Sequence, residues 1–244
     1  MAELTAAILA GGLGTRLRPL MADRPKVLAQ IRGRPFLAYL LDQLVAAGIR
    51  YVVLCTGYLS DQIRAEFGDT YSTLNLVYSQ EPSPLDTAGA LRFALPLFKH
   101  GLSEVNVSES VLIMNGDSFC EVDLMAFCAW HQSQGANATL LLTEVSHVTG
   151  YGRVHVDVGG RVLRFNEKGD TGGSGWVNAG IYLLNRRLLQ TIPTGRAVSL
   201  EREMFPAWID RNMYGYLNKG RFLDIGTPER YAGAERFFAL EPQT

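Results

Sequence analysis

Two sets of residues near the amino terminus have backbones and side chains that suit phosphate groups. They are the glycines Gly11, Gly12 and Gly14 and the cations Arg16, Arg18 and Lys26. Glycines expose backbone N–H groups, and arginine and lysine add positive charge, so a loop that holds both is able to bind a chain of phosphates. This spacing predicts a polyphosphate site directly after the apolar run at residues 4–9.

The same loop matches neither of the two common nucleotide-binding fingerprints. The third glycine of the dinucleotide pattern G-x-G-x-x-G is missing, and so is the Gly-Lys-Ser/Thr of a Walker loop. A glycine-rich turn without a ligand is the alternative interpretation. The three cations favour the phosphate site over such a turn.

The overall charge excludes proteins that bind nucleic acid or anionic membranes through bulk charge. The 244-residue chain has a formal net charge of -1 at pH 7 and a pI near 6.4, so an anion has to be bound locally. The amino terminus lacks the basic residues of a signal peptide, and no apolar stretch reaches the ~20 residues that span a bilayer. We therefore expect a soluble cytoplasmic protein that binds neither nucleic acid nor membrane.

Cysteine and histidine form no catalytic or metal-binding arrangement in the sequence. The cysteines Cys55, Cys120 and Cys128 lie in apolar stretches without the short spacing of metal ligands, which predicts buried free thiols in a reducing compartment. The histidines have no evident catalytic setting. They are His100, His131, His147 and His155.

Strands and helices alternate through about residue 135. Apolar runs predict strands at 4–9, 51–55, 74–78 and 111–114, and apolar residues at helical spacing predict helices at 36–45, 60–67 and 87–98. This alternation is typical of an α/β fold with a doubly wound, mostly parallel central sheet. Ligands of such sheets bind beyond the carboxyl ends of the strands, so we expect the glycine loop and Asp117 to face one cleft.

The second half of the chain is richer in strands. They are predicted at 138–145, 153–158, 161–165, 177–184 and 213–217, with shorter connections, and are expected to continue the first sheet as a mixed second half. Residues 171–175 predict a mobile loop. Thr227 and Pro228 predict the start of a terminal helix that ends near Ala239.

Several motifs resemble one family of enzymes along nearly the whole chain. Residues 9–20, followed by residues 24–28, resemble the A-G-G-x-G-T-R-L-x-P loop and the P-K pair of the sugar-1-phosphate nucleotidylyltransferases. The resemblance implies a Rossmann-like, GT-A-like fold, built as a three-layer α/β/α sandwich. It also implies one nucleotidyltransferase domain over residues 1–244, with a nucleotide-binding part at 1–135 and a sugar-phosphate-binding part at 136–244.

The resemblance assigns roles to the phosphate loop and to two aspartates. The loop backbone is implied to bind the nucleotide at Leu9, Ala10, Gly11, Gly12, Gly14 and Thr15. Arg16 is implied to contact the triphosphate, and Lys26 the phosphates during transfer. Asp117 in the N-G-D element and Asp224 in the D-I-G-T-P element match the aspartates that bind Mg²⁺. Taken alone, Asp117 could be a turn residue, and Asp224 could help to start a helix.

Three further motifs resemble the sugar-phosphate site of the family. Gly152 lies in the Y-G element, which contacts the sugar through its backbone, and Asn178 lies in the N-A-G-I-Y strand. Glu167 and Lys168 form the E-K element, whose glutamate binds sugar hydroxyls and whose lysine meets the sugar phosphate. A solvated surface pair is the alternative for Glu167 and Lys168.

The implied reaction is attack by a sugar-1-phosphate oxygen on the α-phosphorus of a nucleoside triphosphate, with loss of pyrophosphate. The attacking phosphate is largely dianionic near neutral pH, because its second pKa is about 6, and so no general base is required. Cations and positioning lower the barrier between the two anions. The expected catalytic residues are Arg16, Lys26, Asp117 and Asp224, with Mg²⁺ as the cofactor held by the two aspartates.

Residues 80–91 correspond to the base-binding element of the family, with Glu81, Asp86, Thr87 and Gly89 as the expected nucleotide contacts. Asp86 stands where many relatives have glycine, and aspartate tolerates a left-handed backbone better than most residues. Guanine presents two adjacent N–H donors to a carboxylate, whereas uracil and thymine present one. Glu81 or Asp86 therefore favours GTP, and a solvated loop acid is the alternative for either.

The motifs most resemble those of the bacterial D-glycero-α-D-manno-heptose 1-phosphate guanylyltransferases, which make GDP-heptose for surface glycans. The end of the chain at residue 244, without a hexapeptide-repeat β-helix, favours the same group. The alternatives are a mannose-1-phosphate guanylyltransferase, a short uridylyltransferase and a non-catalytic relative that binds nucleotide sugar and regulates a partner. The expected ligands are GTP and a sugar 1-phosphate, and the sequence leaves open whether two copies form a homodimer.

Overall fold

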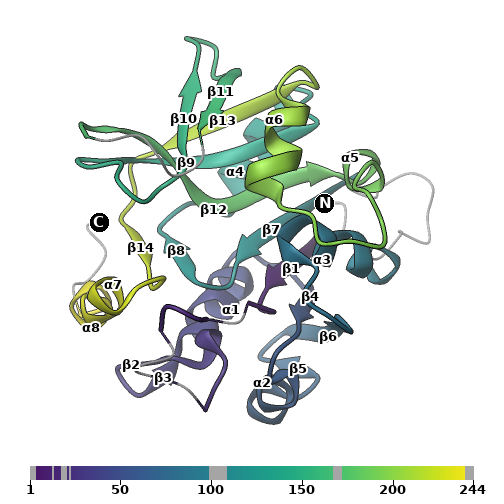
Figure 1. The fold of residues 1–244 in the computed structure, drawn as a ribbon, viewed down its shortest axis with the longest axis vertical. Helices are drawn as coiled ribbons and strands as arrows, with labels where there is room; N and C mark the ends of the chain where they lie inside the picture. Colours follow the sequence, from purple (N-terminus) through teal and green to yellow (C-terminus); the bar gives the residue numbers. More distant parts are fainter. Residues whose placement is uncertain are drawn as a thin grey trace.

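A ten-stranded sheet forms the centre of the molecule (Figure 1). The computed structural model describes residues 4–12, 14–17, 21, 23–98, 109–166 and 172–239. The strands of this sheet are β1 (Thr5–Leu9), β4 (Tyr51–Thr56), β5 (Thr70–Tyr71), β6 (Leu74–Gln80), β7 (Ser110–Asn115), β9 (Ala138–Val145), β10 (Arg153–Val156), β11 (Val162–Asn166), β12 (Gly175–Asn185) and β13 (Met213–Asn218).

The strand order combines a parallel half with a mixed half. The path through the sheet is β11-β10-β12-β7-β1-β4-β6-β5, and β9 pairs with both β12 and β13. The pairs β7–β1, β1–β4 and β4–β6 are parallel, whereas β12 runs antiparallel to β7. Because β12 pairs directly with β7, the second half continues the first sheet, as predicted.

Helices cover both faces of the sheet. They are α1 (Phe36–Ala46), α2 (Ser60–Phe67), α3 (Asp86–Ala94), α4 (Leu124–Ser133), α5 (Arg186–Gln190), α6 (Phe205–Trp208), α7 (Pro228–Ala232) and α8 (Ala234–Phe237). One hydrophobic cluster, which includes Phe36 and Phe127, packs α1, α2 and α4 against one face. A second cluster, which includes Leu91 and Phe205, packs α3, α5 and α6 against the other face. The fold is therefore the predicted three-layer α/β/α sandwich.

Shorter elements connect and flank these layers. They are the 3₁₀ turns η1 (Lys26–Leu28) and η2 (Leu95–Leu97), the π-helical turn η3 (Leu200–Met204), and the small strands β2 (Gln30–Ile31), β3 (Arg34–Pro35), β8 (Ser118–Cys120) and β14 (Phe222–Asp224). The pair β8–β14 forms a separate two-stranded sheet beside the central one. Four of these elements, η1, η3, β8 and β14, contribute residues to the site described below.

The elements predicted for the first half are present, with one helix shorter than expected. The helix predicted at 36–45 is α1, and Gly48 follows it with a left-handed φ of 74°, a common way to end a helix. The helix predicted at 87–98 ends at Ala94, where η2 takes over. Sequence reasoning missed α4, whose first N–H groups are capped by the Asp123 carboxylate.

Two expectations are wrong, one for the terminal helix and one for Cys128. The terminal helix predicted as one element is two short helices, because a turn at Gly233 separates α7 from α8. Cys55 and Cys120 are buried as expected, whereas Cys128 on α4 is only partly buried.

The loop predicted at 171–175 overlaps β12, which begins at Gly175, and Thr171 lies outside the described residues.

His131 is a buried residue of α4 whose ring contacts the strands β7 and β9. Its ring nitrogens lie 2.9 Å from the Ser110 hydroxyl and 2.7 Å from the Thr139 hydroxyl. Burial lowers the pKa of His131 to about 4, so the ring is neutral at neutral pH. His100 lies outside the described residues. Among the helices that the structure describes, none combines the length and apolar composition needed to cross a bilayer.

Candidate active site

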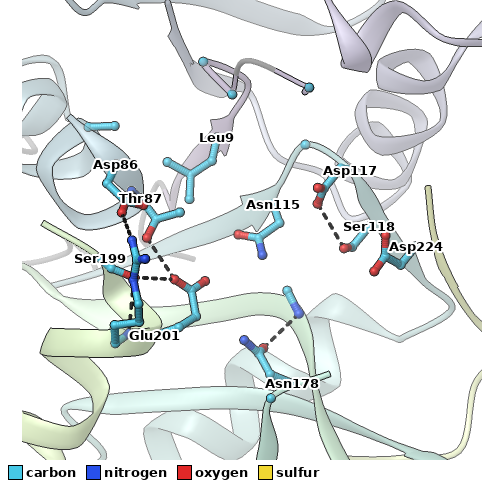
Figure 2. Close-up of a pocket in the computed structure, with 18 of the residues that line it drawn as sticks. Leu9, Asp86, Thr87, Asn115, Asp117, Ser118, Asn178, Ser199, Glu201 and Asp224 are labelled. Atoms are coloured by element: carbon cyan, nitrogen blue, oxygen red, sulfur yellow. Dashed lines mark hydrogen bonds and ion pairs between the residues drawn. The ribbon is translucent and has the colours of Figure 1, made fainter. Parts of the chain in front are cut away.

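A cavity of about 810 Å³ opens at the carboxyl ends of β1 and β7. Figure 2 shows acidic and amide side chains from both halves of the chain around it. The predicted site residues that line it are Leu9, Gly11, Gly12, Gly14, Thr15, Arg16, Glu81, Asp86, Thr87, Asp117, Gly152, Asn178 and Asp224. The position is the one expected for a ligand site in a doubly wound sheet.

The remaining predicted residues fall elsewhere or outside the described chain. Ala10 is 3% exposed and donates its N–H to the Cys55 carbonyl oxygen at 2.8 Å. Gly89 is buried in α3, and its N–H donates to the Val198 carbonyl oxygen at 3.1 Å. Neither lines the cavity, because both are used for packing the elements that surround it. Glu167 and Lys168 lie outside the described residues.

Backbone contacts hold the glycine loop against the loop that follows β7. The N–H of Gly116 donates to the carbonyl oxygen of Leu9 at 2.9 Å. A Cβ atom added at Gly116 would lie 2.5 Å from that same oxygen, so the close approach requires glycine. This approach sets the phosphate loop directly beside Asp117.

The pairing of β8 with β14 brings the two predicted metal-binding aspartates together. Asp224 stands opposite Ser118 in the register, and the Ile225 N–H donates to the Asp117 carbonyl oxygen at 2.9 Å. The two aspartates come from positions 107 residues apart in sequence (224 minus 117). In Figure 2 both side chains lie at the same end of the cavity, beside Ser118.

Each of these aspartates is paired with a cation from another element. Lys26 Nζ, at the start of η1, lies 2.5 Å from Asp117 Oδ2, and the Lys26 side chain is only 12% exposed. Arg230 Nη1, on α7, lies 2.6 Å from Asp224 Oδ2. The Arg230 guanidinium also lies over the Tyr151 ring, 4.0 Å from its centroid. Lys26 is therefore part of the site even though it does not line the cavity.

The donor set at this end fits a hard divalent cation that keeps other ligands. Mg²⁺ is commonly bound by one or two carboxylates together with substrate phosphates, rather than by a cage of protein ligands. Asp117 and Asp224 supply two such carboxylates. No group of three or more Asp, Glu, His or Cys residues suited to a metal occurs in the described part of the chain, which agrees with a site completed by phosphate oxygens.

The opposite end of the cavity begins at the turn into α3. Asp86 has a left-handed φ of 58°, so the expectation that aspartate keeps the turn is confirmed. Its Oδ1 accepts the Thr87 N–H at 2.7 Å, and its Oδ2 lies 2.5 Å from Arg202 Nη2. The Asp86 carboxylate is thus used to fix the loop and to pair with η3.

Glu81 packs closely against two backbone segments of the same end. Its Oε2 accepts the Leu85 N–H at 3.0 Å. Its Oε1 occupies the space where a Cβ at Gly11 or Gly57 would stand, 2.7 Å from each such atom. Burial raises the pKa of Glu81, and the negative charge of Asp86 adds to the effect.

Sequence reasoning missed Ser199, Glu201 and Arg202, which also line the cavity. They lie at and just before η3, a turn that the sequence pattern does not predict. The Thr87 hydroxyl donates to Glu201 Oε2 at 3.0 Å, across a separation of 114 residues. Burial raises the pKa of Glu201. The only local signal is the polar pair Glu201 and Arg202 beside apolar residues.

A hydrogen-bond network orients Asn178 in the wall formed by β12. The Gly180 N–H donates to Asn178 Oδ1 at 2.9 Å, and Asn178 Nδ2 donates to the Tyr182 hydroxyl at 2.8 Å. Asn115 Nδ2 donates to the same hydroxyl at 3.3 Å. Burial raises the pKa of Tyr182 well above its ordinary value, so its hydroxyl stays protonated.

Two relatives with similar sequences are named as guanylyltransferases of sugar 1-phosphates. The mannose-1-phosphate guanylyltransferase of Mycobacterium tuberculosis is 36% identical over 233 residues, which are 94% of this chain and 63% of that protein. The D-glycero-alpha-D-manno-heptose 1-phosphate guanylyltransferase of Aneurinibacillus thermoaerophilus is 34% identical over 234 residues, which are 96% of this chain and 97% of that protein. This chain thus spans just under two thirds of the mycobacterial relative.

The structure of HddC from Yersinia pseudotuberculosis complexed with GMP-PN superposes with a TM-score of 0.81 at 29% identity, covering 96% of this chain and 99% of that one. A family model described as Nucleotidyl transferase matches residues 5–240. This match extends over both walls of the cavity and all the elements that position them. The chain belongs to the nucleotidyl transferase family.

Proposed function

We propose that the protein transfers a guanylyl group from GTP to a sugar 1-phosphate, which gives a GDP-sugar and pyrophosphate. The observation that carries this proposal is the meeting of Asp117 and Asp224 beside the glycine loop, at the carboxyl ends of the strands. Relatives named as guanylyltransferases, at 36% and 34% identity, support the choice of reaction and of GTP.

In the proposed reaction, an oxygen of the sugar phosphate forms a bond to the α-phosphorus of GTP. The bond between the α-phosphorus and the bridging oxygen breaks, and its electron pair leaves with pyrophosphate. The attacking phosphate is largely dianionic near neutral pH, so no side chain has to remove a proton. In agreement, no histidine of the described chain lines the cavity.

The cations of the site would stabilise charge that moves during transfer. Arg16 lines the cavity at the glycine loop, and would bind the β- and γ-phosphates as they leave. Lys26, beside Asp117, would bind oxygens of the α-phosphate. Asp117 and Asp224 would hold Mg²⁺, which when bound neutralises phosphate charge and acts as a Lewis acid.

We assign guanine recognition to Glu81 rather than to Asp86. The Asp86 carboxylate is engaged by Arg202 and by the Thr87 N–H, whereas the Glu81 carboxylate accepts from the neutral Leu85 N–H and pairs with no cation among the described residues. Burial makes the charge of Glu81 costly unless further donors meet it. The N1–H and N2–H groups of guanine are such donors.

Two sugar 1-phosphates are candidates for the acceptor. D-glycero-α-D-manno-heptose 1-phosphate is the first, because the motifs most resemble those of the heptose enzymes, and the heptose relative is 34% identical. Mannose 1-phosphate is the second, because the mycobacterial relative is 36% identical and is named for mannose. For either sugar, we assign nucleotide binding to residues 1–135 and binding of the sugar phosphate to residues 136–244.

A pyrophosphate-release assay tests the proposal. The purified protein is incubated with Mg²⁺, with GTP, UTP, ATP or dTTP, and with a panel of sugar 1-phosphates. We expect the highest kcat/KM for GTP with heptose 1-phosphate. Preference for mannose 1-phosphate would reverse the order of the two sugars, and preference for UTP would contradict the base assignment. No release with any pair would favour a non-catalytic nucleotide-sugar-binding protein.

A further inference from the structure

Glu201 is a cavity-lining acid for which the proposed reaction has no role. It lies at the start of η3, and Figure 2 shows its side chain directed into the cavity between Thr87 and Asn115. Burial raises the pKa of Tyr182, the β12 residue whose hydroxyl Asn178 contacts, and the negative charge of Glu201 adds to this effect. Glu201 therefore lies between the nucleotide wall and the β12 wall.

Two hydroxyl groups fix one oxygen of this carboxylate. Thr87 Oγ1 donates to Glu201 Oε2 at 3.0 Å, and Ser199 Oγ donates to it at 3.2 Å. Thr87 Oγ1 in turn accepts the Leu200 N–H at 2.8 Å, and Ser199 Oγ accepts the Arg202 N–H at 3.2 Å. Because each hydroxyl accepts from the backbone, its hydrogen points to Glu201. The carboxylate is held rigidly before any ligand binds.

Apart from these two hydroxyls and the backbone N–H of Glu201 itself, no described residue donates to the carboxylate, and no described cation pairs with Glu201. The residue nevertheless lines the cavity in surroundings that disfavour its charge. A partly buried carboxylate without a cation is costly unless ligand donors complete its hydrogen bonds. Its fixed position suits neutral donors at a defined place, such as hydroxyl groups.

We propose that Glu201 is a specificity-determining residue that accepts hydrogen bonds from hydroxyl groups on the sugar ring of the sugar 1-phosphate. This inference rests on the proposed function, since it names a contact to the acceptor substrate of that reaction.

The packing of η3 favours the sugar over the base or the ribose of GTP. Phe205, next to η3, packs on Phe165 and on Tyr182, with ring centroids 5.4 and 5.1 Å apart. Phe165 lines the cavity directly against Gly152. These contacts join η3 to the wall that carries Gly152 and Asn178, which the proposed function assigns to the sugar phosphate.

The substitution Glu201→Gln tests this contact with little change of shape. Because the Thr87 and Ser199 hydroxyls need an acceptor, the amide oxygen of glutamine is expected to take the place of Oε2. The amide NH₂ group then faces the cavity, so an acceptor is replaced by a donor. We expect KM for the sugar 1-phosphate to rise by about 10- to 100-fold, the range for a lost hydrogen bond to a charged group. The dissociation constant for GTP should stay within about twofold, since no GTP contact is changed.

The measurements use mannose 1-phosphate and heptose 1-phosphate, with deoxy analogues of mannose 1-phosphate that each lack one ring hydroxyl. In the wild-type protein, removal of one or two particular ring hydroxyls from the sugar should weaken its binding. In Glu201→Gln, removal of the same hydroxyls should weaken sugar binding little further. Such non-additivity identifies the hydroxyls that Glu201 contacts. Calorimetry with a non-hydrolysable GTP analogue present measures sugar binding without turnover.

Glu203→Gln is the matched control, because Glu203 lies two residues away in η3, pairs with Arg196 at 2.8 Å and does not line the cavity. Glu201→Asp replaces the glutamine variant in the test if that variant does not fold. It shortens the side chain by one methylene group and should also weaken sugar binding. Unchanged sugar binding in the folded Glu201 variants, or a loss confined to GTP, would overturn the inference. Absence of turnover in the wild-type protein would instead contradict the proposed function, and the calorimetric arm would still decide the role of Glu201.

Discussion

At one end of the cavity, Asp117 and Asp224 are each paired with a side-chain cation, Lys26 and Arg230. At the other end, Glu201 accepts from the Thr87 and Ser199 hydroxyls, and Glu81 accepts from a backbone N–H. The first pair of acids is compensated by opposite charge, whereas the second pair accepts only from neutral donors among the residues that the structure describes. The two ends therefore suit different parts of a ligand.

At the first end, the cations that pair with Asp117 and Asp224 can change partners when charged ligands bind. Lysine and arginine are able to move from a carboxylate to a phosphate, since both are strong partners for either group. At the second end, the acids are held by groups that belong to the backbone and to packed loops, so their positions do not depend on a charged ligand. We infer that the first end carries out phosphoryl chemistry and that the second end selects substrates.

The largest expected effect comes from removing an acid at the first end. Asp117→Asn should lower kcat by about 10³-fold or more, because a metal-binding carboxylate supports several kcal/mol of transition-state stabilisation. The asparagine oxygen still accepts from Lys26, so the far-ultraviolet circular dichroism spectrum should stay unchanged. Asp61→Asn, on the exposed face of α2, is the control. Normal turnover of Asp117→Asn would show that this end does not perform the chemistry.

A smaller effect is expected when the cation beside Asp224 is removed. Arg230 does not line the cavity, and it holds Asp224 while stacking over Tyr151. Arg230→Gln should raise the Mg²⁺ concentration needed for half-maximal activity by about 10- to 100-fold, the usual effect of losing a partner of a metal ligand. Arg230→Lys should recover part of this loss, because it restores the charge without the stacking.

Arg236→Gln, on exposed α8, is the control for the Arg230 variants. A Mg²⁺ titration of activity at saturating GTP and sugar 1-phosphate separates an effect on metal binding from a loss of kcat. An unchanged Mg²⁺ requirement in Arg230→Gln would mean that the ion pair of Asp224 has no role in metal binding.

The two ends also differ in how far the sequence predicts them. The glycine loop and Asp117 directly follow apolar strands, so local pattern alone places them at one edge of the sheet. Asp224 lies on a strand of three residues, too short for a periodic signal, and only the resemblance to a family identified it. The start of the terminal helical segment at Pro228 was predicted, whereas its division at Gly233 and its end at Phe237, before the expected Ala239, were not.

Glu201 could not be predicted because its role depends on contacts distant in sequence. Its donor Thr87 is 114 residues away, and neither residue belongs to a pattern that indicates the other. The same holds for Arg202, whose partner Asp86 lies 116 residues away. In contrast, the left-handed backbone of Asp86 was predictable, because it depends on the residue type and on the turn itself.

Base selection at the second end is expected to depend on Glu81. In Glu81→Gln, the preference for GTP over ITP, which lacks the N2 amino group, should fall by about tenfold, as expected for one lost hydrogen bond to a charged group. The ratio of kcat/KM values for the two nucleotides measures this change. Glu66→Gln, on the exposed surface of α2, is the control. A retained preference would remove Glu81 from the base site and leave the backbone of the loop to select guanine.

The smallest effect is expected at Asp86, which lines the second end of the cavity and pairs with Arg202. Its partner Arg202 has a side chain that is 59% exposed, and that of Asp86 is 30% exposed, so solvent screens the pair and its contribution should be at most about 1 kcal/mol. Asp86→Asn removes the charge and keeps tolerance of the left-handed backbone, whereas Asp86→Ala also adds roughly 1 kcal/mol of backbone strain. Urea unfolding of both variants is compared with that of Arg202→Gln and of the double variant Asp86→Asn/Arg202→Gln. The comparison separates the free energy of the ion pair from the free energy of backbone strain. A coupling energy between Asp86 and Arg202 well above 1 kcal/mol would show that charge pairing is as important at this end of the cavity as it is around Asp117 and Asp224.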